Sequence, residues 1–380
     1  MPLAIGLIGC GNISDIYLTN AKLFRDLAMV ACADLRPEAA SAKATRYGLR
    51  SMSVDGLIAA DDIDLVLNLT VPAAHTEVSL AAIAAGKHVY TEKPLAITLA
   101  DGMAILGAAV AAKVRVGSAP DTVLGPGVQQ SRAMMGDGLT GEIVCGVSAV
   151  LSRGMEHWHP NPDFFYRAGA GPVLDLGPYH IAALTTLLGP VKTVRATGRI
   201  GFTERTVTAD GPMMGKSFKV ETLTTVNALL SFHSGAEVTF LASWDVWNHG
   251  LRPIELYGKV ASLRVPDPDF FGGVIELSEG RDRWKPFETS RLPLGGTNWP
   301  TAEPRLANYR SVGLADMATA ILTGRPHRCS GQFALHGLAV MLGILESAIE
   351  GQAVEIAVAT EQPQPFGKDD LAGLGYATTG

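Results

Sequence analysis

Apolar runs alternate with segments of helical spacing over residues 1–122. Each run is short enough for a buried strand, and turn or helix-stop residues separate it from the next segment. Such an alternation predicts βαβ units and a parallel sheet covered by helices. The expected strands are 3–8, 28–33, 64–70 and 87–90, and the expected helices are 12–25, 37–47 and 75–85.

The pattern changes after residue 122, where strand-like runs crowd together and several alternate with period two. This texture predicts a second, α+β domain with a large, open and mostly antiparallel sheet. We therefore expect domains at 1–122 and 123–380. The strand-like runs are 143–151, 191–200, 220–232, 236–244, 253–258 and 261–265, and the helical segments are 172–188, 308–323 and 332–350.

Composition excludes several classes of protein. Of 380 residues, 47% are hydrophobic and 18% are charged, which is incompatible with a largely disordered chain. The net charge is −6 and basic residues are scattered, so we expect no nucleic-acid partner. The apolar runs 103–112 and 338–345 are short for a membrane span, and the apolar N-terminus lacks the basic region of a signal peptide. Four separate cysteines without a CxxC pair fit a reducing, cytoplasmic location.

A glycine turn follows the first expected strand. Gly9-Cys10-Gly11-Asn12-Ile13-Ser14 has the form G-x-G-x-x-S and precedes a helix, where free N–H groups bind a dinucleotide pyrophosphate. Gly9 permits the turn and Gly11 lets phosphates approach, with Asn12 and Ile13 beside them; the alternative is a plain strand–turn–helix connection.

An acidic residue ends the second expected strand. Asp34 stands where a carboxylate binds the adenosine ribose hydroxyls, and it would repel a 2′-phosphate. NAD is therefore expected rather than NADP. Leu35 and Arg36 follow it, and Arg36 could bind that phosphate if Asp34 turned aside; the alternative for Asp34 is a helix or turn cap.

Glu92-Lys93-Pro94 ends the fourth expected strand, at the sheet edge where open α/β sheets bind ligands. Pro94 keeps Lys93 out of helical geometry and could form a cis peptide bond. On physics alone, Lys93 could equally be a solvated surface lysine.

At this point the chain resembles the Gfo/Idh/MocA family of sugar and cyclitol oxidoreductases, through at least residue 190. The resemblance rests on the glycine turn, Asp34, the segment TVPAAH at 70–75 and above all GKHVYTEKPL at 86–95. It implies an N-terminal Rossmann domain and a C-terminal domain whose open sheet serves substrate binding and assembly into a homodimer or homotetramer. It also implies that Lys93 lies near the nicotinamide and the substrate, and that the cofactor is held in part by Thr70, Pro72, His75, Glu92 and Lys93.

A second family motif is an aspartate followed four residues later by histidine or tyrosine. Asp175 and Tyr179 match it in GPVLDLGPYH, as in the tyrosine-bearing branch of the family. On one continuous helix these positions share a face, and His180 is turned away by about 100°. We expect Lys93, Asp175 and Tyr179 to be catalytic. His180 could replace Tyr179 if the helix began one residue later, and Asp175 could also serve as an N-cap.

An aromatic, proline-broken segment precedes this motif. We expect His157, Trp158 and His159 to contact a polyol substrate together with Lys93, Asp175, Tyr179 and His180, although the aromatic rings could simply pack the loop. His157 and His159 lack further ligands at metal spacing, so no metal is expected. The glycine-lysine segment 211–217 has one residue too few between its glycines for a phosphate loop.

The sequence thus predicts an NAD(P)-dependent dehydrogenase acting on a CH–OH group of a sugar, sugar derivative or cyclitol. Alternatives are a carbonyl reductase that prefers NADPH, an enzyme that recycles a tightly held cofactor between two sugars, and a non-catalytic relative that senses NAD. Burial and an oxidised cofactor would lower the pKa of Lys93, and the lysine cation would in turn favour the tyrosinate form of Tyr179.

Overall fold

The computed structural model describes residues 1–280, 283–299 and 307–376. Its N-terminal part is a six-stranded parallel sheet in the order β3-β2-β1-β4-β5-β6, which confirms the expected doubly wound fold. The strands are β1 (Leu3–Ile8), β2 (Leu27–Ala33), β3 (Arg50–Met52), β4 (Leu65–Asn68), β5 (His88–Thr91) and β6 (Val116–Ser118). The helices are α1 (Ser14–Ala21), α2 (Pro37–Tyr47), α3 (Val54–Ala59), α4 (Pro72–Ala84) and α5 (Leu99–Ala112).

Hydrophobic runs were the reliable signal in this domain. The central strands β1 and β4 are buried on both faces, so their runs are nearly continuous. Strands β3 and β6 were not predicted because they have only three residues each, and α3 was not predicted because six residues are too few to show a helical period. Helix α5 was not predicted because its alanine- and glycine-rich sequence lacks a clear polar face.

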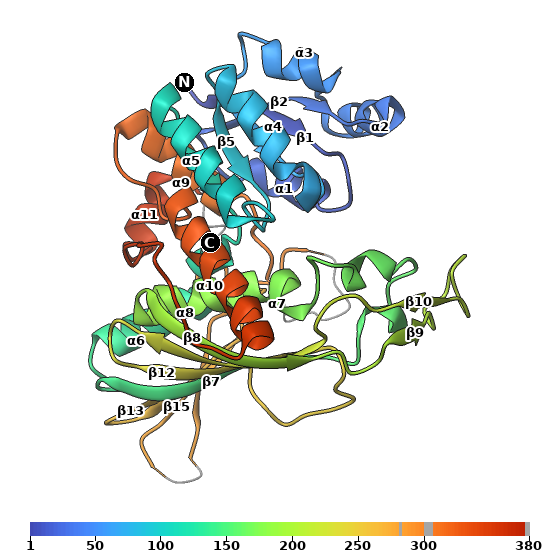
Figure 1. Ribbon diagram of the computed structural model, residues 1–380. Helices are drawn as coiled ribbons and strands as arrows, with labels where there is room; N and C mark the ends of the chain where they lie inside the picture. Colours follow the sequence, from blue (N-terminus) through green and yellow to red (C-terminus); the bar gives the residue numbers. More distant parts are fainter. Residues whose placement is uncertain (281–282, 300–306, 377–380) are drawn as a thin grey trace.

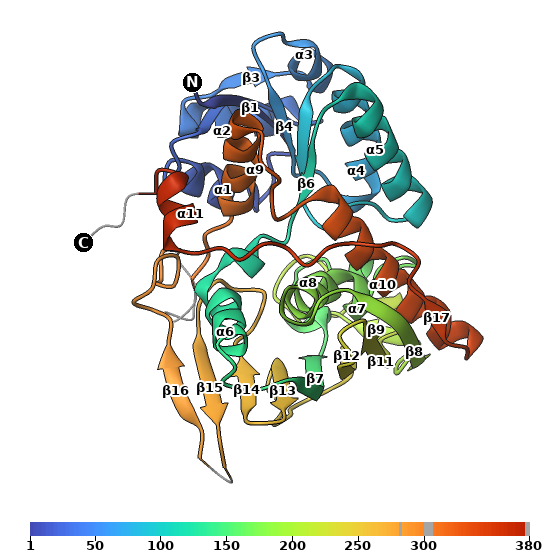
Figure 2. The ribbon, with the colours of Figure 1, turned by 90° about the vertical axis from the view of Figure 1, so that its left-hand side faces the viewer.

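The C-terminal part is a nine-stranded sheet in the order β16-β15-β14-β13-β7-β12-β11-β8-β17. All neighbours are antiparallel except β7 and β12, so the expected mostly antiparallel sheet is confirmed. Helices α6 (Pro126–Gly136), α8 (Gly177–Leu188) and α10 (Gly331–Glu350) lie on one face, and in the described residues no helix covers the other (Figure 2). The strands are β7 (Ile143–Leu151), β8 (Val191–Arg199), β11 (Thr225–Phe232), β12 (Glu237–Ser243), β13 (Ile254–Gly258), β14 (Ser262–Val265), β15 (Val274–Ser278), β16 (Lys285–Glu288) and β17 (Val354–Glu355), and a separate pair is formed by β9 (Glu204–Thr206) and β10 (Ser217–Lys219).

The expected helix at 172–188 is interrupted. It divides into α7 (Pro172–Asp175) and α8 (Gly177–Leu188), with Leu176 between them at φ −106°. Pro178 lacks the N–H that would bond to the Leu174 carbonyl in a continuous helix, and proline is well tolerated only in the first turn, where it stands in α8. The expectation of one continuous helix carrying Asp175 and Tyr179 is therefore wrong.

The chain returns from the second sheet to the first. Helix α9 (Val312–Thr323) packs against α1 and β6, and α10 (Gly331–Glu350) contacts α5 and β6 on one side and α8 and β8 on the other (Figure 1). Helix α11 (Lys368–Gly373) packs its Leu371 into the core cluster of the first sheet. The boundary at residue 122 stays a prediction, because parts of both expected segments build the first domain.

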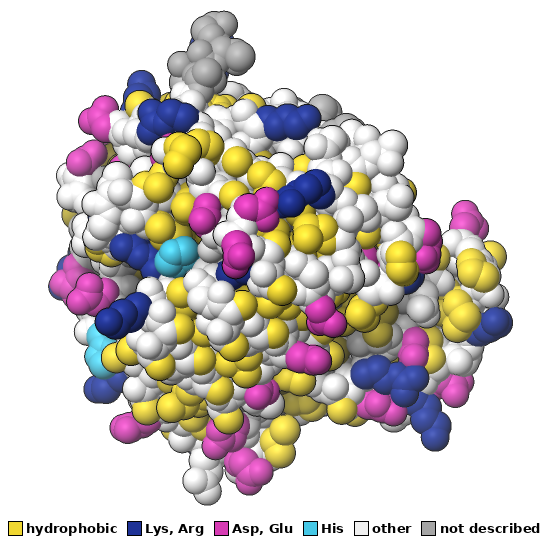
Figure 3. All heavy atoms as spheres, turned by 90° about the horizontal axis from the view of Figure 1, so that it is seen from above, with side chains coloured by type: hydrophobic (Ala, Val, Ile, Leu, Met, Phe, Trp, Pro, Cys, Tyr) yellow, Lys and Arg dark blue, Asp and Glu magenta, His cyan; other side chains and the backbone are white. Residues whose placement is uncertain are grey.

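Helix α10 is, in the described part of the chain, the one helix long and apolar enough to cross a membrane. More than half of its apolar window is buried inside the fold, as in the core helix of a globular protein. The face seen from above carries acidic and basic side chains interspersed with apolar ones (Figure 3).

Candidate active site and dinucleotide cradle

The glycine turn packs tightly on one side and is open on the other. Gly9 has φ +102°, and a Cβ there would lie 2.5 Å from the carbonyl oxygen of Leu69. A Cβ on Gly11 would meet nothing within 4 Å. The hydroxyl of Ser14 donates to the Gly11 carbonyl at 2.6 Å and ties the turn to the start of α1. The turn therefore leaves room for a ligand beside Gly11, at a helix N-terminus.

Asp34 is fastened to this turn. Its Oδ2 accepts from the Cys10 backbone N–H at 2.8 Å, and its Oδ1 accepts from the Arg36 N–H at 2.9 Å. The Arg36 Nε lies 3.6 Å from Oδ1, while Leu35 is 91% exposed. The carboxylate is thus held beside the turn by the backbone, and the space next to Gly11 together with this acid fits a dinucleotide.

His75 links two parts of the site. It is fully buried, with Nδ1 2.7 Å from the Pro94 carbonyl and Nε2 3.0 Å from the Thr70 carbonyl. Thr70 in turn donates its hydroxyl to Asn68 Oδ1 at 2.7 Å. The ring therefore supports the loops of the site, and Pro72 is exposed at the start of α4. Contact of His75 or Pro72 with the cofactor stays a prediction.

Glu92 plays a similar supporting role. Its Oε1 accepts from the Tyr17 hydroxyl at 2.8 Å, and its Oε2 accepts from the Lys93 N–H at 2.9 Å. The buried carboxylate therefore joins α1 to the end of β5 and fixes the backbone that carries Lys93. The Lys93–Pro94 peptide bond is cis.

Lys93, Asp175 and Tyr179 meet where the two domains face each other. The Lys93 Nζ donates to the Asp175 carbonyl at 2.7 Å and to its Oδ1 at 3.3 Å. It also lies 5.1 Å from the centre of the Tyr179 ring. Asp175 and Tyr179 stay close together despite the helix break at Leu176, because both lie against the Lys93 amino group. The side chains of Lys93 and Asp175 stay 16% and 26% exposed.

The charge states of Lys93 and Tyr179 follow from burial and from the neighbouring charges; the effect expected of an oxidised cofactor stays a prediction. Burial lowers the pKa of Lys93, but the negative charge of Tyr179 (when ionised), Asp175 and Glu92 outweighs it, and the pKa is raised. Burial raises the pKa of the Tyr179 hydroxyl, against the opposing effect of the Lys93 cation. At neutral pH the cofactor-free site therefore holds a lysine cation and a neutral phenol.

His180 lies apart from this group. It is buried, and its Nδ1 is 2.8 Å from the Ser148 hydroxyl on β7. Burial lowers the pKa of His180 to about 4. Because α8 begins at Gly177, Tyr179 rather than His180 faces Lys93. Substrate contact through His180 stays a prediction.

The aromatic segment folds largely onto itself. The His157 Nδ1 lies 2.6 Å from the Thr208 hydroxyl, and the His159 Nδ1 accepts from the Asn161 N–H at 3.1 Å. The His159 ring packs edge-on against Trp158, Phe164 and Phe165. Within the described residues, the hydrogen bonds and ring contacts of His157, Trp158 and His159 do not reach Lys93, so their substrate role stays a prediction. The alternative of packing describes His159 best.

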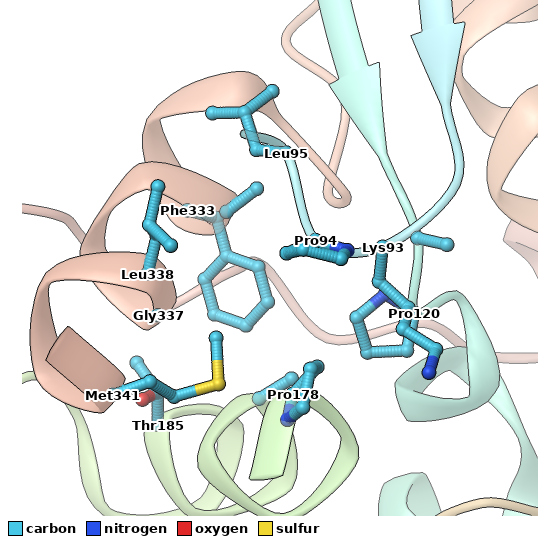
Figure 4. A pocket seen from close by; sticks show the side chains of 13 residues that line it. Lys93, Pro94, Leu95, Pro120, Pro178, Thr185, Phe333, Gly337, Leu338 and Met341 are labelled. Carbon is cyan, nitrogen blue, oxygen red and sulfur yellow. The ribbon is translucent and has the colours of Figure 1, made fainter. Parts of the chain in front are cut away.

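An apolar cavity of about 20 Å³ lies next to the Lys93–Pro94 segment. Phe333, Leu338 and Met341 of α10 and Pro178 of α8 surround it, and Lys93 lies beyond Pro94 as seen from Phe333 (Figure 4). The cavity is too small for a sugar. It therefore belongs to the packing that fixes Pro94.

Two charged residues of the site escaped the sequence analysis. The Arg310 Nη2 donates to the Tyr179 hydroxyl at 3.1 Å and to Asp269 Oδ1 at 2.8 Å. Arg310 lies 131 residues beyond Tyr179 and in no motif that the sequence reveals. The hydrophobic pattern could not predict that Arg310 lies beside Tyr179, because this contact depends on the return of the chain to the first domain.

Comparisons with known proteins agree with the fold of both domains. Residues 3–119 match the family model described as "Oxidoreductase family, NAD-binding Rossmann fold", and residues 128–264 match "GFO/IDH/MocA C-terminal domain". The chain is 27% identical to 1,5-anhydro-D-fructose reductase of Ensifer adhaerens over 92% of this chain and 98% of that protein. It is 30% identical to D-glucoside 3-dehydrogenase of Escherichia coli over 62% of this chain and 68% of that protein. Among solved structures, levoglucosan dehydrogenase in complex with NADH and levoglucosan superposes with a TM-score of 0.78 at 22% identity, covering 94% of this chain and 100% of that one.

Proposed function

The chain belongs to the Gfo/Idh/MocA family of NAD-binding oxidoreductases, and we propose that it interconverts a secondary alcohol and a ketone on a sugar, sugar derivative or cyclitol. The observation that carries this proposal is the meeting of Lys93, Asp175 and Tyr179 at the carboxyl edge of the dinucleotide-binding sheet. The similar reductase and dehydrogenases act on sugars or sugar derivatives by their names.

The cofactor fits the cradle described above. Gly9 and Gly11 would receive the pyrophosphate, and Asp34 the adenosine ribose. When bound, nicotinamide supplies or accepts the hydride. The carboxylate of Asp34 supports NAD over NADP, because a 2′-phosphate would meet a second negative charge.

Each residue of the trio has a distinct task. Tyr179 exchanges a proton with the substrate oxygen, and the Lys93 cation stabilises negative charge on that oxygen. Asp175 holds Lys93 through two acceptors and so fixes its direction.

The resting protonation state favours one direction of catalysis at neutral pH. A neutral phenol can donate a proton to a ketone at once, whereas alcohol oxidation requires its prior deprotonation. We therefore expect the oxidation rate to rise with pH while the reduction rate does not.

The test is a panel of sugars, anhydrosugars and cyclitols with NAD, NADP and their reduced forms. Nicotinamide absorbance reports turnover, and product analysis identifies the reacting carbon. Turnover of a polyol or keto sugar with NAD(H) is the expected result. Nicotinamide binding without turnover of any member would overturn the proposal and favour a cofactor sensor. Nucleotide released on denaturation would identify a tightly held cofactor.

The Lys93→Met variant tests the site. We expect turnover to fall at least about a hundredfold, the loss typical of a missing acid–base or charge-stabilising group, while NAD binding persists. Lys259→Met is the matched control, since Lys259 is 60% exposed and forms an ion pair with the exposed Glu142, far from the motif residues in the sequence. Near-parental turnover of Lys93→Met would contradict the assignment.

We also propose that the chain forms a homodimer or homotetramer through the uncovered face of the nine-stranded sheet. Val144 and Leu229, on β7 and β11, are 49% and 45% exposed. Light scattering of the purified protein tests this, and a monomer at micromolar concentration would refute it. The four unpaired thiols support a reducing, cytoplasmic location.

A further inference from the structure

Arg310 is a buried cation that donates hydrogen bonds to three side chains, one of which is the active-site tyrosine. Its guanidinium donates to Asn308 Oδ1 at 2.7 Å, to Asp269 Oδ1 at 2.8 Å and to the Tyr179 oxygen at 3.1 Å. The side chain is 8% exposed. A buried arginine needs hydrogen-bond partners, but the Asp269 carboxylate alone would balance its charge. The contact with the Tyr179 oxygen therefore needs a separate explanation.

The backbone next to Arg310 is strained. Ser311 has φ +102°, which is rare for any residue other than glycine. Asp121 Oδ2 accepts from the N–H groups of Ser311 and Gly313 at 3.0 Å each, and the Ser311 hydroxyl donates to the Tyr17 carbonyl at 2.9 Å. Strain that neighbouring groups maintain in this way is typical of functional positions. Here the contacts with Asp121 and Tyr17 hold the backbone that follows Arg310.

We propose that Arg310 is a positioning residue for the reaction: it holds the phenol oxygen of Tyr179 and directs the phenol proton toward the substrate. This inference rests on the proposed function. Arg310 carries only donors, so the Tyr179 oxygen must accept from it, and the hydroxyl proton points elsewhere. In the described residues no group accepts the hydroxyl proton of Tyr179. The substrate oxygen is then the acceptor of this proton.

Arg310 also stabilises the tyrosinate that forms when a ketone has taken the proton. The Lys93 and Arg310 cations lower the pKa of Tyr179, whereas burial raises it, as do the carboxylates of Asp269 and Glu92. Without Arg310 the phenol would be harder to ionise. The charged or titratable groups around Tyr179 are Lys93 and Glu92 after β5, Asp175 on α7, Asp269 between β14 and β15, Arg310 before α9, and Tyr17 on α1, which shares Glu92.

A titration that needs no substrate tests the inference first. Trifluorotyrosine, whose phenol is more acidic than that of tyrosine, replaces Tyr179, and its fluorine resonance is followed against pH in the cofactor-free protein. We expect Arg310→Gln to move the ionisation upward by about one pH unit or more, since an adjacent charge typically shifts a pKa by one to three units. Arg310→Lys should move it less. Asp269→Asn should move it downward. An unchanged titration in Arg310→Gln would overturn the inference.

Kinetics then separate a role through Tyr179 from a general effect on folding. With a substrate from the panel, Arg310→Gln should lower kcat about tenfold or more and leave the NADH dissociation constant unchanged. In a Tyr179→Phe background the same substitution should cost less than about twofold, because its partner is gone. Equal losses in both backgrounds would refute the positioning role, and a Tyr179→Phe enzyme as active as the parent would refute the role of Tyr179 as proton donor on which it depends. Failure of the proposed function would show differently, as a parent protein that turns over no member of the panel. Arg310→Lys, which keeps a donor and a charge, covers the case in which Arg310→Gln fails to fold.

Discussion

The two glycines of the dinucleotide turn, Gly9 and Gly11, have different roles, and alanine substitution at each position distinguishes them. Gly9 adopts a left-handed conformation against the chain at Leu69, whereas Gly11 faces open space. Gly9→Ala should therefore damage the fold. Gly11→Ala should leave the fold intact and remove the space that a pyrophosphate needs.

The magnitude for Gly9 has two parts. Holding a residue other than glycine at φ +102° costs on the order of 1–3 kcal/mol. The new Cβ would lie 2.5 Å from the Leu69 carbonyl oxygen, a backbone atom fixed by the sheet, and such overpacking adds about 1–3 kcal/mol. The sum of about 2–6 kcal/mol is a large part of the 5–15 kcal/mol that usually stabilises a protein. For Gly11, stability within about 1 kcal/mol of the parent is expected.

Urea unfolding followed by circular dichroism measures the first effect, and quenching of protein fluorescence by NADH measures the second. Gly11→Ala should bind NADH at least about tenfold more weakly, which corresponds to about 1.4 kcal/mol. Parental affinity in Gly11→Ala would show that phosphates do not approach this turn. Parental stability in Gly9→Ala would show that the conformational and contact arguments are wrong.

Three further substitutions test other parts of the structure. Asp34→Ala should improve the kcat/KM ratio for NADP over NAD by about tenfold or more, and an unchanged ratio in steady-state assays would contradict the ribose assignment. Burial raises the pKa of Asp121 to about 6, above its value in the unfolded chain. Because the unfolded chain ionises first as the pH rises, the free energy of unfolding should fall by up to about 3 kcal/mol between pH 4 and 6. Asp121→Asn should flatten this part of the stability–pH curve in urea unfolding, and an equally steep curve would contradict the raised pKa. Arg205 is buried between Glu156 and Asp245, so Arg205→Ala should destabilise the protein by about 3–5 kcal/mol, and a melting temperature equal to that of the parent would contradict that.

Much of the first domain was predictable because its signals are local. The apolar strands, the glycine turn and Asp34 lie within consecutive residues, and each follows from the geometry of one strand–turn–helix unit. Lys93 required the family resemblance, since a lysine at a strand end is usually solvated.

The rest of the site depends on contacts between distant segments. Arg310 reaches Tyr179 only because α9 returns to the first sheet, and no periodicity encodes that return. The charge states of Lys93 and Tyr179 depend in the same way on burial and on carboxylates from other elements. Pro178 was visible as a helix breaker, but its effect was overlooked because the spacing of Asp175 and Tyr179 suggested one helix.

The return of α9, α10 and α11 to the first sheet has a mechanical consequence. Hinge closure needs a few residues on one axis to absorb the motion, but here several crossings would have to bend together. One hydrophobic cluster runs from Val66 in the first sheet through Leu338 of α10 to Val194 in the second. The two domains should consequently move as one rigid body rather than by a clamshell motion.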